Sequence, residues 1–276
     1  MRGTRAPAAA RVLATLVAAL FVLPLVLMAF GALQPAGRTA PTGWDILPLP
    51  PSLGGLQEAF RLEPLGGQLV NSLIVVSAAV PLSVLCASWA GFAMAQLPPR
   101  RRRWAVGAAL VLLVVPLPAL WVPRFVLFSR LGLVDGYVPL IAPALMGTTT
   151  FSVLLFYWSY RRIPRDLIDA ARLEGLGPLR AWWSVGEPLV RPTAFAVAAL
   201  AFVAHWGNFI DPLLYLYSRE TYTLPLGMRS LYFLGAGGTS MALAAALVAT
   251  IPPVLAFAAV QRRFLQATRG AGWLGR

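Results

Sequence analysis

The sequence predicts an all-α polytopic membrane protein with six transmembrane helices. Only 12% of its 276 residues are charged and 58% are hydrophobic, whereas soluble domains average roughly 25% charged residues. Six stretches contain no Asp, Glu, Lys or Arg, and each is long enough to cross a bilayer, which takes about 20 mostly apolar residues. We therefore expect a single transmembrane domain over residues 1–276. Its expected spans are about 12–33, 69–97, 104–122, 137–160, 193–211 and 241–260.

The distribution of arginine predicts the orientation of these spans. All 23 basic residues are arginines, and the net charge is +13. With the N-terminus in the cytoplasm, 17 arginines fall on the cytoplasmic side and 6 on the other side. Cytoplasmic loops carry the excess of basic residues, so we expect both termini and the loop 161–191 in the cytoplasm. Since the charge follows this topology and no soluble domain remains to carry a binding face, we expect no nucleic-acid partner.

The first three spans differ in character. The first follows a basic start, as a signal peptide does, but its apolar run of about 22 residues exceeds the usual ~7–15 and favours an uncleaved helix. The outer loop 34–68 is rich in Pro and Gly, and residues 56–62 are expected to form a short helix. Small residues in the second span allow close helix packing in lipid. Pro116 and Pro118 in the third indicate either a packing kink or backbone groups that open toward a cavity.

A strongly charged block, residues 163–192, separates the fourth span from the fifth. Its first part predicts a short amphipathic helix, because Pro164 suits a first helical position and Asp166 complements the helix dipole in the first turn. An apolar stripe is formed by Leu167, Ile168 and Ala171. The small pair Ala170-Ala171 would let another surface approach closely, and the charges beside it could fix the orientation. A docking helix needs this pattern, although a solvated amphipathic helix would also show it.

The same block contains a break and a second helix. Gly175 is placed to adopt the left-handed conformation that ends a helix, and Gly177-Pro178 prevents its continuation. Pro178 can then begin a second helix that runs to about Glu187, before Pro188.

The order of residues in this block is Asp169-Ala170-Ala171, then Gly175, then Glu187-Pro188-Leu189 and Pro192. This order resembles the EAA loop of the binding-protein-dependent ABC importer permeases. Asp169 replaces the usual Glu, and Glu187 stands where Leu usually precedes the proline. In that family the loop carries a coupling helix that sits in a cleft of the cytoplasmic ATPase. The resemblance therefore implies an ATPase-coupling role for Asp166, Asp169, Ala170, Ala171, Glu174, Gly175 and Gly177.

Three further strings resemble the carbohydrate-uptake branch of the same family. Asn71-Ser72-Leu73 is similar to the Asn-Ser-Leu that opens the second span there. The string from Trp206 to Leu213 resembles Trp-Asn-Asp-Phe followed by Pro-Leu, with Gly207 and Asn208 in place of Asn-Asp. The string from Thr221 to Gly227 matches Tyr-Thr-Leu-Pro, a hydrophobic residue and Gly, and it is the most specific of the three.

Polar residues at the outer end of the fifth span are candidates for the substrate path. An ionisable residue at membrane depth indicates function by default, and the only histidine lies here. The candidates are His205, Trp206, Asn208 and Asp211. Because water reaches this end of the span, an interfacial structural role is the alternative interpretation.

The sequence predicts neither catalysis nor a bound cofactor or metal. It has one His and one Cys, Cys86, which cannot form a metal cluster, and its acids lie at opposite membrane faces. Gly-Lys-Ser/Thr, which would follow a phosphate-binding loop, is missing. Energy for transport must therefore come from a partner subunit.

Together these features resemble a type I ABC importer permease for a sugar or oligosaccharide, working by alternating access. The resemblance implies a second permease subunit, ABC ATPase subunits, an extracytoplasmic solute-binding protein and residence in the lipid bilayer of a bacterial or archaeal inner membrane. Permeases of another importer class, for phosphate, polyamine or peptide, are an alternative that the Thr221–Gly227 string disfavours. An ion-coupled secondary transporter is another, which the six charge-free stretches disfavour.

Overall fold

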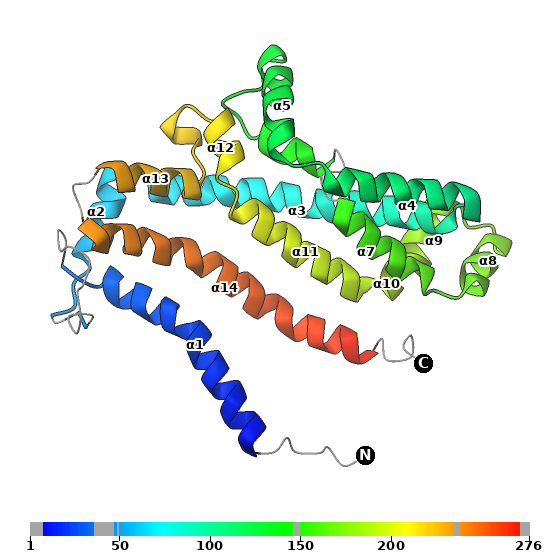
Figure 1. The fold of residues 1–276 in the computed structure, drawn as a ribbon, viewed down its shortest axis with the longest axis horizontal. Helices are drawn as coiled ribbons and strands as arrows, with labels where there is room; N and C mark the ends of the chain where they lie inside the picture. The colour runs from blue at the N-terminus through cyan, green and yellow to red at the C-terminus, as the bar shows by residue number, and fades with distance from the viewer. Residues whose placement is uncertain (1–7, 36–46, 49, 146–149, 235–237, 271–276) are drawn as a thin grey trace. The chain divides into compact units, whose positions relative to one another are not determined.

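The computed structural model describes residues 8–35, 47–48, 50–145, 150–234 and 238–270, with side chains outside 233–234, 259–260 and 262–270. Regular structure within these residues is helical throughout (Figure 1). The chain forms two compact units, Met1–Gln68 with Leu224–Pro252 and Leu69–Thr223 with Pro253–Arg276. Each unit is described by itself below.

The first unit contains three complete helices and parts of two longer ones. These are α1 (Ala8–Ala32), α2 (Gly54–Leu62), α13 (Leu224–Leu234), the start of α3 (Leu65–Gln96) and the first part of α14 (Gly238–Gly270). Apolar side chains along α1 are exposed, as expected of a helix that faces lipid. Only its end packs, where Gly31 lies against Leu243. Helix α2, which was expected at residues 56–62, packs on Ser240 through Gly55.

The second unit is a helical bundle with an aromatic core. Helices α4 (Pro99–Val114) and α11 (Arg191–Trp206) pack on α7 (Thr150–Arg161). Buried side chains of α3, α7, α11 and the segment between α7 and α11 form this core. They include Phe92, Phe156, Tyr160, Trp182 and Val197. Gly91 brings α3 against α7, because a Cβ there would lie 2.6 Å from Phe156 Cβ and 2.7 Å from the Tyr157 nitrogen.

The third expected span is broken rather than continuous. Helix α4 is followed by α5 (Pro118–Arg130), and the two axes differ by 92°. Val115, which precedes Pro116, is extended with ψ 119°, as the clash between a proline ring and the preceding residue demands. Pro116 and Pro118 thus lie at a sharp bend, which is the kink that was one of their two interpretations.

The fourth and fifth expected spans are also composite. Residues 137–160 hold α6 (Val138–Ile141), the 3-10 turn η1 (Ala142–Ala144) and α7, while residues 146–149 lie outside the described part. The fifth span is α11 followed by α12 (Ile210–Tyr215). Three helices, α1, α3 and α14, are long and apolar enough to cross a membrane, or five spans if each sharply bent pair counts as one. The six-span topology therefore stays a prediction.

Candidate functional site

Helix α8 (Arg165–Leu173) carries the predicted coupling residues and ends as the sequence indicates. Gly175 has φ +80°. Its N–H donates to the Arg172 carbonyl at 2.9 Å, and the Leu176 N–H donates to the Ala171 carbonyl at 3.0 Å. These two bonds form a Schellman motif, which satisfies carbonyls that the helix end would leave unpaired. The expected left-handed cap at Gly175 is confirmed.

The buried face of α8 contains two of the three residues of the expected apolar stripe. Ile168 and Ala171 are buried, and Ile168 belongs to the aromatic core of the second unit. Leu167, expected on the same stripe, is 40% exposed. Neighbouring helix residues lie about 100° apart around the axis, so Ala170 points outward while Ala171 points inward. Only one of the paired alanines is thus open to a partner.

The outward surface of α8 and the following turn combines acids with apolar side chains. Asp166, Asp169, Ala170, Glu174, Gly175 and Gly177 are exposed. Leu173 is 90% exposed, and Leu179 and Trp183 are also exposed. Asp169 pairs with Arg172 at 3.1 Å, but both are solvated, so the pair contributes roughly 0–1 kcal/mol. Arg172 also donates to Gln96 Oε1 at the end of α3, at 3.0 Å, which fixes one edge of the helix.

The second helix of the charged block differs from the expectation of an ordinary helix ending before Pro188. It runs from α9 (Pro178–Ala181) through a π turn, η2 (Trp182–Gly186), into α10 (Glu187–Leu189). A bend of 86° then leads into α11. In Figure 1 α8, α9 and α10 lie together at one end of the second unit, with α5 and α12 toward the other.

A buried polar cluster holds this second helix, and sequence reasoning missed it. The cluster consists of Ser88, Tyr160, Trp182 and Glu187, and we call it the Glu187 cluster. Ser88 Oγ and Tyr160 OH lie 2.8 and 3.0 Å from Glu187 Oε2 and 2.7 Å from each other. The Trp182 indole N–H donates to both hydroxyl oxygens, at 2.9 and 3.0 Å. The only sequence signal was Glu187 itself, a carboxylate where the EAA pattern usually has Leu.

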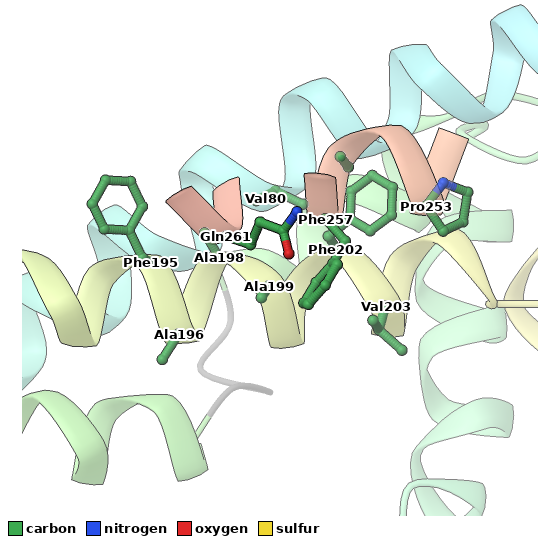
Figure 2. Close-up of a pocket in the computed structure, with 11 residues that line it drawn as sticks. Val80, Phe195, Ala196, Ala198, Ala199, Phe202, Val203, Pro253, Phe257 and Gln261 are labelled. Carbon is green, nitrogen blue, oxygen red and sulfur yellow. The ribbon is translucent and has the colours of Figure 1, made fainter. Parts of the chain in front are cut away.

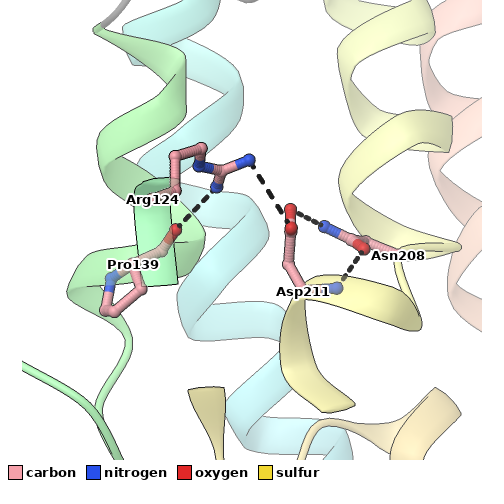
Figure 3. Close-up of polar contacts among 4 residues, drawn as sticks. All are labelled: Arg124, Pro139, Asn208 and Asp211. Carbon is pink, nitrogen blue, oxygen red and sulfur yellow. Dashed lines mark hydrogen bonds and ion pairs between the residues drawn. The ribbon is translucent and has the colours of Figure 1, made fainter. Parts of the chain in front are cut away.

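Two of the candidate substrate-path residues form a polar contact at the end of α11 (Figure 3). Asn208 Nδ2 donates to Asp211 Oδ2 at 2.9 Å, and the Asp211 N–H donates to Asn208 Oδ1 at 3.2 Å. Asp211 also faces Arg124 of α5, with 3.6 Å between Arg124 Nη1 and Asp211 Oδ1 and little of either side chain exposed. Arg124 Nη2 donates to the Pro139 carbonyl at 3.3 Å. Arg124 had no signal in the sequence beyond being an outer arginine.

The other two candidates are placed differently. Trp206 is buried and stacks on Phe202, with ring centroids 5.7 Å apart and planes within 6°. His205 is half-buried beside it in the chain. The four residues thus lie at the end of α11 or just beyond it, and Asn208 and Asp211 are hydrogen-bonded to each other.

Two side chains, Asp135 and Asn71, hold turns of the second unit that are expected to lie on the outer side. Asp135, at φ +58°, accepts hydrogen bonds from the Ser218 hydroxyl and backbone N–H, from the Tyr217 N–H and from the Thr221 hydroxyl. The Ser218 hydroxyl, followed by the two backbone N–H groups, holds the pKa of the Asp135 carboxyl well below its usual range. Asn71 Nδ2 donates to the carbonyls of Glu220 and Tyr222 at 2.7 and 2.9 Å.

These contacts give a structural role to two strings that resemble the carbohydrate-uptake branch, Asn71-Ser72-Leu73 and Thr221–Gly227. Asn71 joins the start of the second span to the turn that contains Thr221, so the two strings meet in space. Within the first unit, Gly227 lies against the carboxamide of Gln68, and a Cβ there would overlap it. Gln68 is buried and donates to Glu63 Oε2 at 3.0 Å. A side chain at position 227 would therefore displace the Gln68 carboxamide from its place beside Glu63.

An apolar groove of about 590 Å³ lies along α11, α3 and the last part of α14 (Figure 2). Its lining includes Phe195, Phe202, Val80 and Phe257, and Gln261 is the one polar side chain among the lining residues. A site for a hydroxyl-rich ligand needs several convergent polar groups. The groove therefore fits an acyl chain or an apolar helix face better than a sugar. Among the described residues, no group of three His, Cys, Asp or Glu is placed to hold a metal ion.

The fold and the charged loop define a class of protein, an all-helical multi-pass transport component. Residues 79–270 match the family described as the inner membrane component of binding-protein-dependent transport systems, and the chain belongs to that family. The fold class and the family inferred from Asp169-Ala170-Ala171 and Gly175 are thereby confirmed. Membership also places the chain in an inner membrane.

Curated relatives extend over most of the chain. An ABC transporter permease protein, ORF1 of Streptomyces antibioticus, is 35% identical over 219 residues, 79% of this chain and 95% of that protein. The lactose transport system permease LacG of Rhizobium radiobacter is 28% identical over 201 residues, 73% of each chain. The arabinooligosaccharides transport system permease AraQ of Bacillus subtilis is 27% identical over 263 residues, 93% of this chain and 92% of that protein.

A solved structure has the same fold. A chain of a bacterial ABC transporter involved in import of the acidic polysaccharide alginate aligns with a TM-score of 0.72 and 16% identity. The alignment covers 95% of this chain and 99% of that chain.

Proposed function

We propose that the chain is the membrane-spanning permease subunit of an ATP-driven importer for a sugar or oligosaccharide. The names of the relatives for lactose and arabinooligosaccharide transport support the substrate class. The staples at Asn71 and Asp135, which order the outer turns, are consistent with a surface on which an extracytoplasmic solute-binding protein docks.

One observation carries the coupling role. Leu173 is 90% exposed and lies beside the exposed acids Asp169 and Glu174, on a loop outside the expected spans. Exposed apolar side chains rimmed by polar residues mark interaction surfaces. This surface fits a cytoplasmic ATPase subunit, because transport needs an energy source and the sequence has no phosphate-binding loop of its own.

The remaining parts of the assembly follow from this role. Both termini and α8 lie in the cytoplasm, as the arginine distribution indicates. A second permease subunit completes the translocation path, and ligand and nucleotide shift the pair between two packings of similar energy. Asn208 and Asp211, with His205 and Trp206, lie at the outer end of that path and contact the substrate or its gate. The apolar groove on α11 is not part of the path.

A matched pair of glycine variants tests the coupling role. Gly175 and Gly177 both have open space where a Cβ would be, but Gly175 has φ +80° whereas Gly177 has φ −65°. Gly175→Ala therefore strains the cap by roughly 1–2 kcal/mol, while Gly177→Ala does not. In complexes purified through this chain and reconstituted in liposomes, we expect Gly175→Ala to lower uptake of labelled di- and oligosaccharides several-fold at unchanged membrane insertion.

Gly177→Ala adds the same methyl group to the same loop without straining the backbone, so its uptake should exceed that of Gly175→Ala. Equal uptake by the two variants would contradict a docking function for the end of α8. A complex without an ATPase subunit would contradict the proposed importer itself.

A further inference from the structure

The Glu187 cluster lies where α8, the π turn and two long helices meet. Ile168 of α8 and Trp182 of η2 belong to the same buried core as Phe92 of α3 and Tyr160 of α7. Ser88, Tyr160 and Trp182 are almost fully buried, and Glu187 is half-buried. Buried hydroxyl and indole groups are costly unless they are hydrogen-bonded. The carboxylate of Glu187 accepts hydrogen bonds from both hydroxyls, and the hydroxyl oxygens accept from the Trp182 N–H. Each of these buried polar groups therefore has a hydrogen-bond partner within the cluster.

The π turn η2 brings Trp182 and Glu187 of the Glu187 cluster together. In an α-helix, residues five apart lie about 140° apart around the axis, so Trp182 and Glu187 would face different directions. In η2 the Glu187 N–H donates to the Trp182 carbonyl, and this i→i+5 bond places both side chains near one face. Both can then reach Ser88 and Tyr160. Single π turns in helices often occur at functional sites.

Two glycines allow the close approach that the cluster requires. A Cβ at Gly186 would lie 3.1 Å from Tyr160 Cε1 and 3.3 Å from Phe92 Cε2. Gly91, one turn after Ser88 on α3, lets α7 pack against the backbone of α3. The second helix of the charged block therefore packs closely against α3 and α7.

We propose that Glu187 is a positioning residue that transmits motion between α8 and α11. This inference rests on the proposed function, and it adds the route by which the docking helix acts on the membrane helices. Displacement of α8 reaches Trp182 through the shared core, and the cluster moves α10 together with α3 and α7. Since α11 begins at Arg191, shortly after the cluster, the motion reaches α11 instead of being lost at the 86° bend.

The test compares variants that keep or remove the hydrogen-bond acceptor for the hydroxyls of Ser88 and Tyr160. Glu187→Leu, which installs the residue usual in EAA loops, removes the acceptor, whereas Glu187→Gln keeps a carbonyl oxygen. Trp182→Phe removes the indole N–H together with part of the ring system, and it is tested if the Glu187→Leu complex does not assemble. Ser184→Ala is the matched control, because Ser184 is an exposed residue of the same π turn. Reconstituted complexes are assayed for sugar taken up per ATP hydrolysed.

We expect Glu187→Leu to lower this coupling ratio by about fivefold or more, the lower end of typical couplings between linked sites. Glu187→Gln and Ser184→Ala should stay near the unaltered ratio. Combining Ser88→Ala with Glu187→Leu should lower the ratio by less than the sum of the two single effects, because both act on one network. A purely structural role would lower the amount of assembled complex and leave the ratio unchanged, which would overturn the proposal.

A second readout does not depend on any ATPase. Spin labels at Leu173→Cys on α8 and Arg101→Cys on α4, in a Cys86→Ser background, report the position of α8 in the full chain in nanodiscs. We expect a narrow distance distribution in the unaltered protein and with Glu187→Gln, and a broad one with Glu187→Leu or Trp182→Phe. Equal widths would overturn the proposal even if transport is confirmed. Broadening in a chain that binds no ATPase would contradict the proposed function and leave the positioning role of Glu187 standing.

Discussion

Asp135 combines a left-handed backbone with a fully engaged carboxylate. Asp is one of the few residues other than Gly that adopts a positive φ readily, and its short side chain reaches the N–H groups of Tyr217 and Ser218. Those bonds favour the charged form of the carboxylate, which is why its pKa is lowered in the folded protein. The order of the 216–222 turn should therefore depend on pH.

The direction of this dependence follows from the lowered pKa. The unfolded value for Asp is about 3.9, so the stabilisation is complete above about pH 4 and is lost as the pH falls further toward the folded pKa. We expect the exchange protection of the Tyr217 and Ser218 amides, corrected for intrinsic rates, to be constant at mildly acidic pH and to fall below about pH 4. Asp135→Asn should remove this pH dependence. Unchanged protection in strong acid would mean that the staple does not hold the turn.

Among the elements, the crossing of α3 and α7 depends on one glycine. Gly91→Ala places a methyl group within 3 Å of the Phe156 side chain and the Tyr157 backbone, and backbone cannot yield as a flexible side chain can. Overpacking of this kind costs about 1–3 kcal/mol, occasionally more. We expect a lower thermal unfolding temperature in detergent for Gly91→Ala.

Gly107→Ala in α4 provides the comparison. Gly107 has open space around it, and alanine favours a helix interior by up to about 1 kcal/mol. That variant should be neutral or slightly stabilised. If both variants unfolded at the same temperature, close backbone packing between α3 and α7 would not be a source of stability.

Local signals predicted the end of α8 and the presence of α2, whereas contacts between distant residues could not be predicted from them. The cap at Gly175 and the short helix α2 depend on residues within a few positions of each other, so the sequence alone indicates them. The sequence alone does not select the bend at Val115, because Pro116 and Pro118 suit both a kink and backbone groups that open toward a cavity. The π turn at Trp182 could not be predicted, since it depends on Ser88 and Tyr160, which lie far away in the chain.

The same reasoning applies to the candidate site. Asn208 and Asp211 were singled out because polar residues are rare at membrane depth, and they do bond to each other. Arg124, which faces Asp211, lies on another helix, so the sequence alone could not identify it as a partner. Glu187 was visible in the sequence only as a departure from the EAA pattern, and its hydrogen bonds explain why a carboxylate is tolerated there.

For the whole molecule, the arginine distribution fixes a testable topology. Seventeen arginines lie on one expected side and six on the other, and this bias orients membrane proteins. We expect a reporter fused after Arg180 to read as cytoplasmic and one fused after Ser218 to read as external. A fusion after Arg130 should also read as external. An external signal at Arg180 would reverse the topology and remove α8 from the side where ATP is hydrolysed.

The most direct test of the central claim is a photo-crosslink from Leu173. A photoreactive amino acid at this 90% exposed position should link the chain to a nucleotide-binding ATPase subunit in native membranes, identified by mass spectrometry. The same amino acid at Val203, exposed on α11 within an expected span, should not give this product. A Leu173 crosslink to an ATPase would establish the coupling surface, whereas links to lipid alone, or the same products from both positions, would contradict it.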